Sequence, residues 1–215
     1  ITTATGLTAV GAGGTASSVA GIPFYSADTS SIYTSDVSGT DDDAAGNTAY
    51  GYQAMDAITT GDNNAAFGAS ALGANTTGSH NTGIGREALR DNTTGSGNIA
   101  LGQNAAAVNT TGTRNTAIGY QAYKASDTEN DNMAIGFQAM TTNTAGGTAN
   151  IAIGNYAMDA LTSGDNNVAL GINAGGAITT AGQNVYVGNS AGSGSGQAGD
   201  YVTLVGYAAG IDNEV

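Results

Sequence analysis

A short pattern, Asn-x-Ala-Φ-Gly-x-x-Ala in which Φ is apolar, recurs along most of this 215-residue chain. Its first copy runs from Asn47 to Ala54. A repeat of this kind predicts a solenoid, because one unit can bury its faces only by stacking on its neighbours. Seven of the nine intervals between copies are 17 residues and two are 18, with the Gly at Gly51, Gly68, Gly85, Gly102, Gly119, Gly136, Gly154, Gly171, Gly188 and Gly206.

Two columns of this alignment are uniform, and a third is nearly so. The residue before the Gly is apolar in every copy, from Tyr50 and Phe67 to Val187 and Val205, so we expect this column to be buried. The column two residues before the Gly is Ala or Gly until Tyr186 and Leu204, where we expect the small-residue seam to widen or end. Three residues after the Gly stand ten Ala, which predict a space for one methyl group: Ala54, Ala71, Ala88, Ala105, Ala122, Ala139, Ala157, Ala174, Ala191 and Ala209.

The spacing within the repeat predicts strands and turns. Alternation within Asn-x-Ala-Φ-Gly indicates a strand with one small face and one bulky face, both of them packed. The second half of the repeat holds turn residues, as in 75–78, 92–95 and 109–112. A helix is excluded because Gly recurs too often and no helical apolar period is sustained. We therefore expect coils of two short strands and two turns, which stack to about 48 Å for ten coils.

Composition excludes several classes of function. The formal net charge is −13, and the chain has four basic residues, so it lacks the basic stripe that nucleic acids or anionic membranes require. It has no Cys, and no apolar stretch is long enough to cross a membrane as a helix. Acidity suits a protein that stays soluble outside cells. The first residues lack an initiator Met and a charged signal region, so we expect a processed product or a fragment.

The repeat array divides the chain into 1–46, an irregular N-terminal cap or loop region, 47–210, the array, and 211–215, the C-terminal end. Residues 7–11 match the pattern weakly and are a candidate first coil, although 40 residues rather than 34 separate Gly11 from Gly51. The N-terminal region is either a receptor-binding loop, with Tyr25 and Tyr33 as ligand-binding candidates, or a loop that shields the first coil. We favour shielding, because solenoids need atypical ends.

The chain offers little for catalysis. His80 is its one His, so neither a His-based triad nor a His pair for a metal can form. The carboxylates lie mostly in the turns, and nothing places two of them in a desolvated pocket, so we expect no enzyme and no cofactor. Asp62, Asp165 and Asp131 are candidates for calcium, since turns can present hard oxygen ligands. We favour capping roles for these three residues and expect no bound metal.

The pattern resembles two groups of surface fibres. Residues 115–119, Asn-Thr-Ala-Ile-Gly, and 150–154, Asn-Ile-Ala-Ile-Gly, are similar to the head repeats of trimeric autotransporter adhesins of the YadA type. Residues 115–122 are still more similar to the tandem Asn-Thr-Ala-Ile-Gly-Tyr-Gln-Ala repeats of phage tail fibres. The resemblance covers about 47–210 and implies a left-handed parallel β-roll in a homotrimer, with the apolar strand face near the three-fold axis.

Two details qualify this resemblance. The coils of adhesin heads are usually shorter than 17 residues, so the turn here is longer. Fibres of this kind often lose a C-terminal chaperone by cleavage after trimerisation, and we expect the end at 212–215 to be such a mature end.

The function that follows is a structural and adhesive segment of an extracellular fibre, either a phage tail fibre or a bacterial surface adhesin. Its expected partners are further copies of itself and a cell-surface glycan or protein receptor, without nucleic acid and without membrane insertion. Receptor binding is expected where the repeat varies, at Tyr52, Arg86, Tyr120 and Phe137, and in the N-terminal region.

Two alternatives belong to other classes. One is a self-assembling extracellular filament, in which trimers stack end to end. The other is an ice-binding solenoid, although the Thr residues that suggest it lie in turns as adjacent pairs rather than on one strand face. Its motivation is a column of Thr60, Thr77, Thr94, Thr111 and Thr128.

Overall fold

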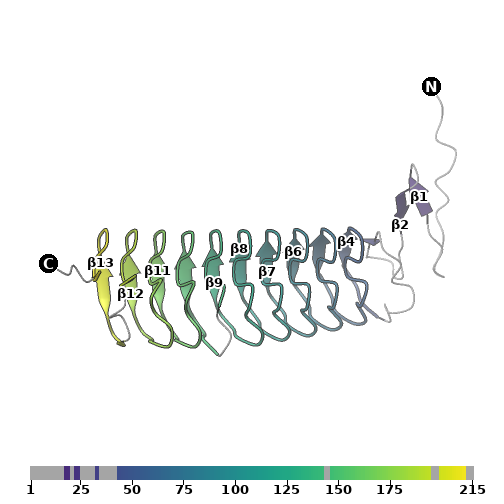
Figure 1. Ribbon diagram of the computed structural model, residues 1–215. Coiled ribbons are helices and arrows are strands. Elements are labelled where there is room, and N and C mark those ends of the chain that lie inside the picture. The colour runs from purple at the N-terminus through teal and green to yellow at the C-terminus, as the bar shows by residue number, and fades with distance from the viewer. Residues whose placement is uncertain are drawn as a thin grey trace, which may run out of the picture.

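The computed structural model describes residues 43–142, 146–194 and 199–211, and three short strands that precede them. This part of the chain is all-β and contains no helix long and apolar enough to cross a membrane. Strands β3 to β13 form one parallel sheet in sequence order, while β1 and β2 pair antiparallel (Figure 1). The strands are β1 (Ser17–Val19), β2 (Ile22–Phe24), β3 (Ile32–Tyr33), β4 (Thr48–Tyr50), β5 (Ala65–Phe67), β6 (Thr82–Ile84), β7 (Ile99–Leu101), β8 (Thr116–Ile118), β9 (Met133–Ile135), β10 (Ile151–Ile153), β11 (Val168–Leu170), β12 (Val185–Val187) and β13 (Thr203–Val205).

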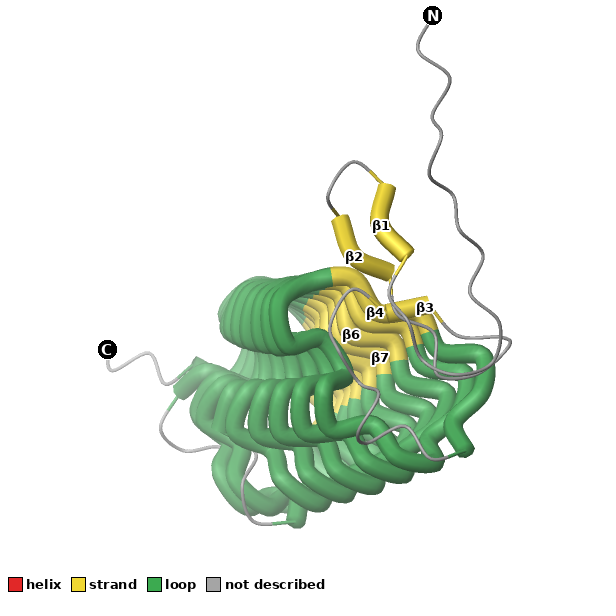
Figure 2. Tube along the Cα trace, turned by 90° about the vertical axis from the view of Figure 1, so that its right-hand side faces the viewer, coloured by secondary structure: helices red, strands yellow, loops and turns green. Residues whose placement is uncertain are grey.

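The predicted β-solenoid is confirmed. Strands β4 to β13 coincide with the ten copies of the repeat, and each strand lies beside its counterpart in the next coil, as Ala100 does beside Ala117. Viewed along the long axis, the coils superpose over most of their outline (Figure 2). The expectation of two strands in each coil was wrong. In the described part of each coil from β4 to β13 there is one strand of three residues, and turns make up the rest because Gly and left-handed residues interrupt any second extended segment.

The inner side of each strand is filled by the small residue of the repeat. Ala100, Ala117 and Ala134 are fully buried at the centre of their strands. The apolar residue before the conserved Gly points the other way, and its predicted burial was wrong in the single chain. Tyr50 and Val205 are 51% and 69% exposed, and the members between them are half-buried or exposed. Alternation along a strand explains the result, because Ala already occupies the inner side.

A second set of residues, four positions after the conserved Gly, fills the coil interior, and the sequence pattern did not reveal it. These side chains are fully buried although their backbone is left-handed, with φ near +50°, a conformation that apolar side chains seldom adopt. Cross-coil hydrogen bonds hold them there, as from Met55 N–H to the Ala71 oxygen at 3.1 Å. The large members are Met55, Leu72, Leu89, Tyr123, Met140 and Met158.

Side-chain size in this interior column and in the strand column is complementary: where one residue is large, the other is small. Tyr186 stands where other coils carry Ala, and it is fully buried. The interior column holds Gly175 and Gly192 beside it, and a Cβ on Gly192 would lie 2.3 Å from Cδ1 of Tyr186. No coil carries a large residue in both of these columns, so the strand and the following turn share one space in the interior.

The conserved Gly column is required by contact between coils. Its residues have φ between +127° and +141°, which L-residues seldom adopt. A Cβ on Gly119 would lie 2.4 Å from the carbonyl oxygen of Gly136 in the next coil, whereas a Cβ on Gly206, in the last described coil, would meet nothing within 4 Å. Gly is therefore required in this column by the close stacking of the coils as well as by the backbone conformation.

A buried ladder of Asn side chains joins the coils beside the strands. The Asn115 backbone N–H donates to Oδ1 of Asn98 at 2.9 Å, and the Asn115 side-chain amide donates to the Glu129 carbonyl oxygen at 2.7 Å. Asn115 thus donates its backbone N–H to the preceding Asn of the ladder, and its Oδ1 accepts the backbone N–H of the following one, Asn132. Burial of these side chains without such bonds would be costly. The ladder consists of Asn47, Asn64, Asn81, Asn98, Asn115, Asn132, Asn150, Asn167 and Asn184.

We expect Gly119→Ala to lower the melting temperature much more than Gly206→Ala does. Both substitutions impose a strained φ, which costs about 1–3 kcal/mol, but only the first places a Cβ against the next coil. Thermal denaturation followed by circular dichroism would compare them. Equal effects of the two substitutions would contradict the contact argument.

The complementary size of the two columns is tested by Tyr186→Ala, Gly192→Met and their combination. Tyr186→Ala should leave a cavity that costs about 3–5 kcal/mol, and Gly192→Met should overpack the same interior. The double variant restores the pairing of Ala with Met seen in other coils, so it should be more stable than the sum of the single effects. A double-mutant cycle from denaturation curves measures this coupling, and strict additivity would contradict it.

Candidate interaction surfaces

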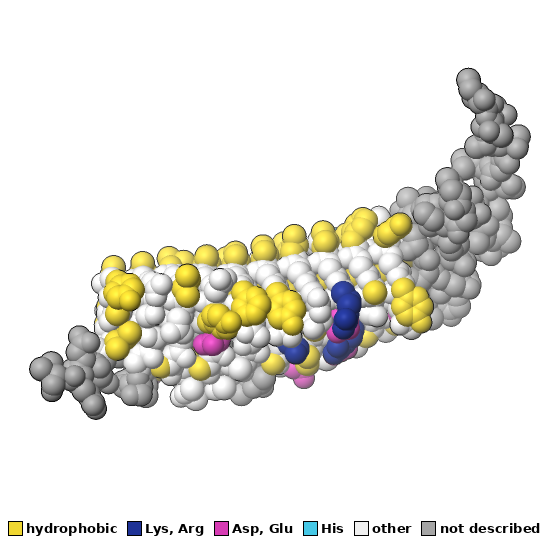
Figure 3. Space-filling view, turned by 45° about the horizontal axis from the view of Figure 1, so that its top comes forward, with side chains coloured by type: hydrophobic (Ala, Val, Ile, Leu, Met, Phe, Trp, Pro, Cys, Tyr) yellow, Lys and Arg dark blue, Asp and Glu magenta, His cyan; other side chains and the backbone are white. Residues whose placement is uncertain are grey.

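The outer side of the parallel sheet is uncharged and largely apolar. Each of the ten strands β4 to β13 turns its first and third residues outward, and all twenty are apolar residues or Thr. Ile84 and Ile99 are each about two-fifths exposed. Hydrophobic side chains form a row along the length of the solenoid in Figure 3. We call these outward residues of β4 to β13 the sheet face. An exposed apolar surface of this extent is typical of an interaction site.

A second surface lies on the turns that follow β8, β9 and β10, where three aromatic rings meet. The Tyr120 and Phe137 rings are stacked, with centroids 5.3 Å apart and planes at 15°. The Phe137 and Tyr156 rings meet edge to face at the same centroid distance. Their side chains are 41%, 39% and 41% exposed. We call Tyr120, Phe137 and Tyr156 the aromatic track; ring-shaped hydrophobic side chains are visible at mid-length in Figure 3.

The aromatic track accounts for two of the residues expected to bind a receptor and adds one. Tyr120 and Phe137 come directly after the conserved Gly, and the structure brings them together. Tyr156 stands two positions after its Gly, so a search of single alignment columns missed it. Tyr52 is 76% exposed on the corresponding turn after β4, four coils before Tyr120, and is not brought to the track.

Of the two N-terminal candidates, the structure describes Tyr33 and not Tyr25. Tyr33 is fully buried on β3, in register with Ala49 of the first complete coil, so its prediction as a ligand-binding residue was wrong. It fills the strand position that Tyr186 fills near the other end. Tyr25 and the candidate coil at 7–11 lie outside the described residues.

The three calcium candidates lie on separate coils and have protein partners. Oδ1 of Asp62 accepts the Ala45 N–H at 2.8 Å, and Oδ1 of Asp165 accepts the Thr148 N–H at 2.7 Å. Asp131 pairs with Arg114 at 2.5 Å, and this hydrogen bond holds the pKa of its carboxyl below the ordinary value. The described residues contain no group of three or more His, Cys, Asp or Glu side chains that could hold a metal ion.

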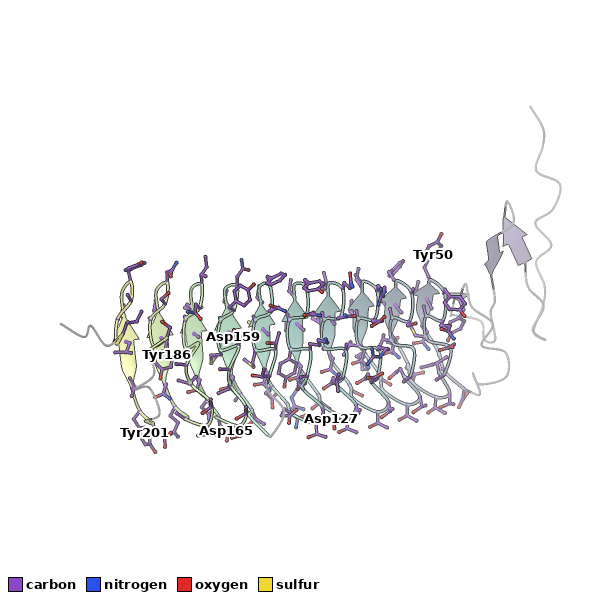
Figure 4. All side chains as sticks on the ribbon, viewed as in Figure 1. Tyr50, Asp127, Asp159, Asp165, Tyr186 and Tyr201 are labelled. Atoms are coloured by element: carbon purple, nitrogen blue, oxygen red, sulfur yellow. The ribbon has the colours of Figure 1, made fainter. Side chains whose placement is uncertain are left out.

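Two further carboxyls are perturbed by burial, which raises the pKa of Asp56 and of Asp159. They stand at equivalent turn positions six coils apart, so the structure does not assemble them into an acid-base pair. Asp159 is labelled in Figure 4. Burial also raises the pKa of the Tyr186 hydroxyl, which lies inside the coil.

Arg86, another expected binding residue, is part of a surface ion-pair cluster. Its guanidinium contacts Oε1 of Glu87 at 2.5 Å, while 59% of its side chain stays exposed. The hydrogen bond from Arg86 is the main reason that the pKa of Glu87 is lowered. Arg90 bridges Glu87 and Asp91, and the hydrogen bond to Asp91 raises its pKa. The positive charge of Arg86 is thus largely compensated within the chain.

The Thr pairs of the turns have two different environments. The first Thr of a pair donates its hydroxyl to the next coil, as Thr76 does to the Thr93 oxygen at 3.0 Å and Thr93 to the Thr110 oxygen at 3.1 Å. The second Thr is exposed, as at Thr77 and Thr94. One row of Thr side chains therefore faces solvent, and the ice-binding alternative stays a prediction.

Glu129 is a buried carboxylate that sequence analysis did not single out. It stands in a turn column where neighbouring coils carry Gly, and a Cβ on Gly112 would lie 2.4 Å from the Glu129 carbonyl oxygen. Oε2 of Glu129 accepts hydrogen bonds from the Ser126 hydroxyl and from the backbone N–H groups of Asp127 and Thr128. Oε1 accepts the Gly146 N–H at 3.0 Å. These bonds replace the water that burial removes.

The coil that follows Glu129 is one of the two with 18 residues. The extra residue precedes Gly147 in the sequence, because the Asn132 side-chain amide reaches the carbonyl oxygen 15 residues on, whereas that of Asn115 reaches the one 14 residues on. Ala181 is the other departure from Gly among the interior coils, and an 18-residue coil follows it too. Ala44, which precedes the first copy of the repeat, fits the same column and is followed by a coil of 17 residues, and nothing in the structure explains this difference.

Because comparisons with known proteins found no match, a functional assignment rests on the sheet face and the aromatic track. No family model, no curated protein and no solved structure matches this chain.

Proposed function

We propose that this chain is a structural segment of an extracellular adhesive fibre, a phage tail fibre or a bacterial surface adhesin, in which three left-handed β-solenoids pack their sheet faces around a common axis. The observation that carries the proposal is the sheet face. It is flat, uncharged and continuous over ten strands, and it exposes Phe67, Ile84 and Leu170. Burial of such a surface against further copies is favourable at about 25 cal/mol per Å² of apolar area.

The rest of the solenoid supports a load-carrying and exposed role. Hydrogen bonds join each coil to the next through the strands, the Asn ladder and the turns, so the long axis is a continuous hydrogen-bonded column. The net charge of −13 favours solubility outside cells. Adhesion is assigned to the turns, because their residues vary while the sheet face and the interior keep their character.

The oligomeric state tests the packing of the sheet faces. Light scattering of the purified chain in dilute solution should give three times the 20.9 kDa of one copy. Ile118→Asp places a charge at the centre of the sheet face and should yield a folded monomer. Thr111→Asp adds the same charge on an exposed turn and serves as the matched control, which should stay trimeric. A wild-type chain that is monomeric, or an Ile118→Asp variant that is still trimeric, would overturn the arrangement.

A further inference from the structure

We propose that the aromatic track, with the amide side chains beside it, binds a neutral saccharide chain. This inference rests on the proposed function, since it assigns the adhesive activity of the fibre to one place on each copy. The site comprises the two residues after the conserved Gly in three successive coils. They are Tyr120, Gln121, Phe137, Gln138, Asn155 and Tyr156.

The fold does not require aromatic residues at these positions. The position directly after the conserved Gly is Ala69, Gln103 and Asn189 in other coils of the same geometry. Mutual stacking stabilises the rings by about 0.5–1.5 kcal/mol per pair, yet each of them stays about two-fifths exposed. Three exposed rings that the coil can do without, gathered on adjacent turns, are characteristic of a binding surface.

The neighbouring amides provide the polar half of the site. Nε2 of Gln138 donates to Oε1 of Gln121 at 2.8 Å, which fixes these two side chains, each the chain neighbour of a ring residue, relative to one another. The bond uses one of the two Nε2 hydrogens of Gln138 and one lone pair of Gln121, so the remaining donors and acceptors can meet hydroxyl groups. Oδ1 of Asn155 accepts the Phe137 N–H at 2.9 Å and fixes the third amide above the central ring's backbone.

This combination selects the chemistry of the ligand. A sugar ring offers apolar C–H groups that pack on aromatic rings and hydroxyl groups that both donate and accept hydrogen bonds. Each of the three turns carries one ring and one amide, and the turns follow one another at the coil spacing of about 4.8 Å, so a chain of sugars can run along the site. All six residues are uncharged, whereas the same two positions two coils before Tyr120 hold the Arg86–Glu87 ion pair. With a net charge of −13, the chain disfavours an anionic saccharide.

Binding can be measured with a panel of immobilised neutral oligosaccharides built from glucose, galactose, mannose and N-acetylhexosamines, with oligogalacturonate as the anionic probe. The best neutral probe is then titrated in solution by calorimetry. Phe137→Gln copies the residue of the equivalent turn at Gln103 and should reduce the affinity at least tenfold while the protein stays folded. Tyr207→Gln removes an exposed aromatic residue from the same column of the turn after β13, outside the track, and should leave the affinity unchanged.

Three outcomes would overturn the inference: no neutral probe binds, the anionic probe binds more tightly, or Phe137→Gln binds as wild type does. The oligomeric mass of the same samples separates this inference from the proposed fibre. A trimer without saccharide binding rejects the site alone, and a monomer that binds through Phe137 rejects the trimer alone.

Discussion

Close stacking of backbone on backbone is the constraint on which the rest of this structure depends. From Gly51 to Gly188, successive coils approach so closely at the conserved Gly column that a Cβ would lie 2.2–2.6 Å from the nearest atom of the next coil. That approach brings strand against strand in register, and it allows Asn115 and its counterparts to reach both neighbouring coils. The buried hydrogen bonds and the narrow interior both follow from this one distance.

Narrowness in turn decides what fills the interior. A coil that is held this tightly does not take a large side chain from both the strand and the position four after the conserved Gly: the turn supplies Leu89, and the strand supplies Tyr186. Side chains that do not fit inside must stand outside. The apolar residues of the sheet face are therefore displaced to the surface by the same geometry that stabilises the core, and the proposed association of three copies gives them a second core.

The sequence predicted the solenoid, the strand positions and the tight space around the Ala three residues after the conserved Gly, which is fully buried from Ala54 to Ala191. Each of these depends on a period that can be counted. Sequence analysis failed where the position of a side chain depends on how the coil closes in three dimensions. The alternation at Ile118 shows that its side chain opposes that of Ala117, but not which of the two faces the interior. The interior column at Leu72 was missed because its left-handed backbone places a bulky residue where turn statistics favour Gly. The ring of Tyr156 joined the track from a different column, and only the folded turn shows that contact.

Glu129 and the extra residue of the following turn have a consequence for how such a chain can change over time. The carboxylate is held by its own turn and by Gly146 of the next coil, so its hydrogen bonding depends on both coils. Repeat arrays commonly lengthen and shorten by recombination between equivalent coils. Recombination that separates the coil of Glu129 from the 18-residue coil after it would leave the buried carboxylate without its fourth hydrogen bond. The 18-residue coil would then keep its extra residue without a Glu side chain beside it. The array is therefore free to gain or lose coils elsewhere, while this pair is expected to be inherited together.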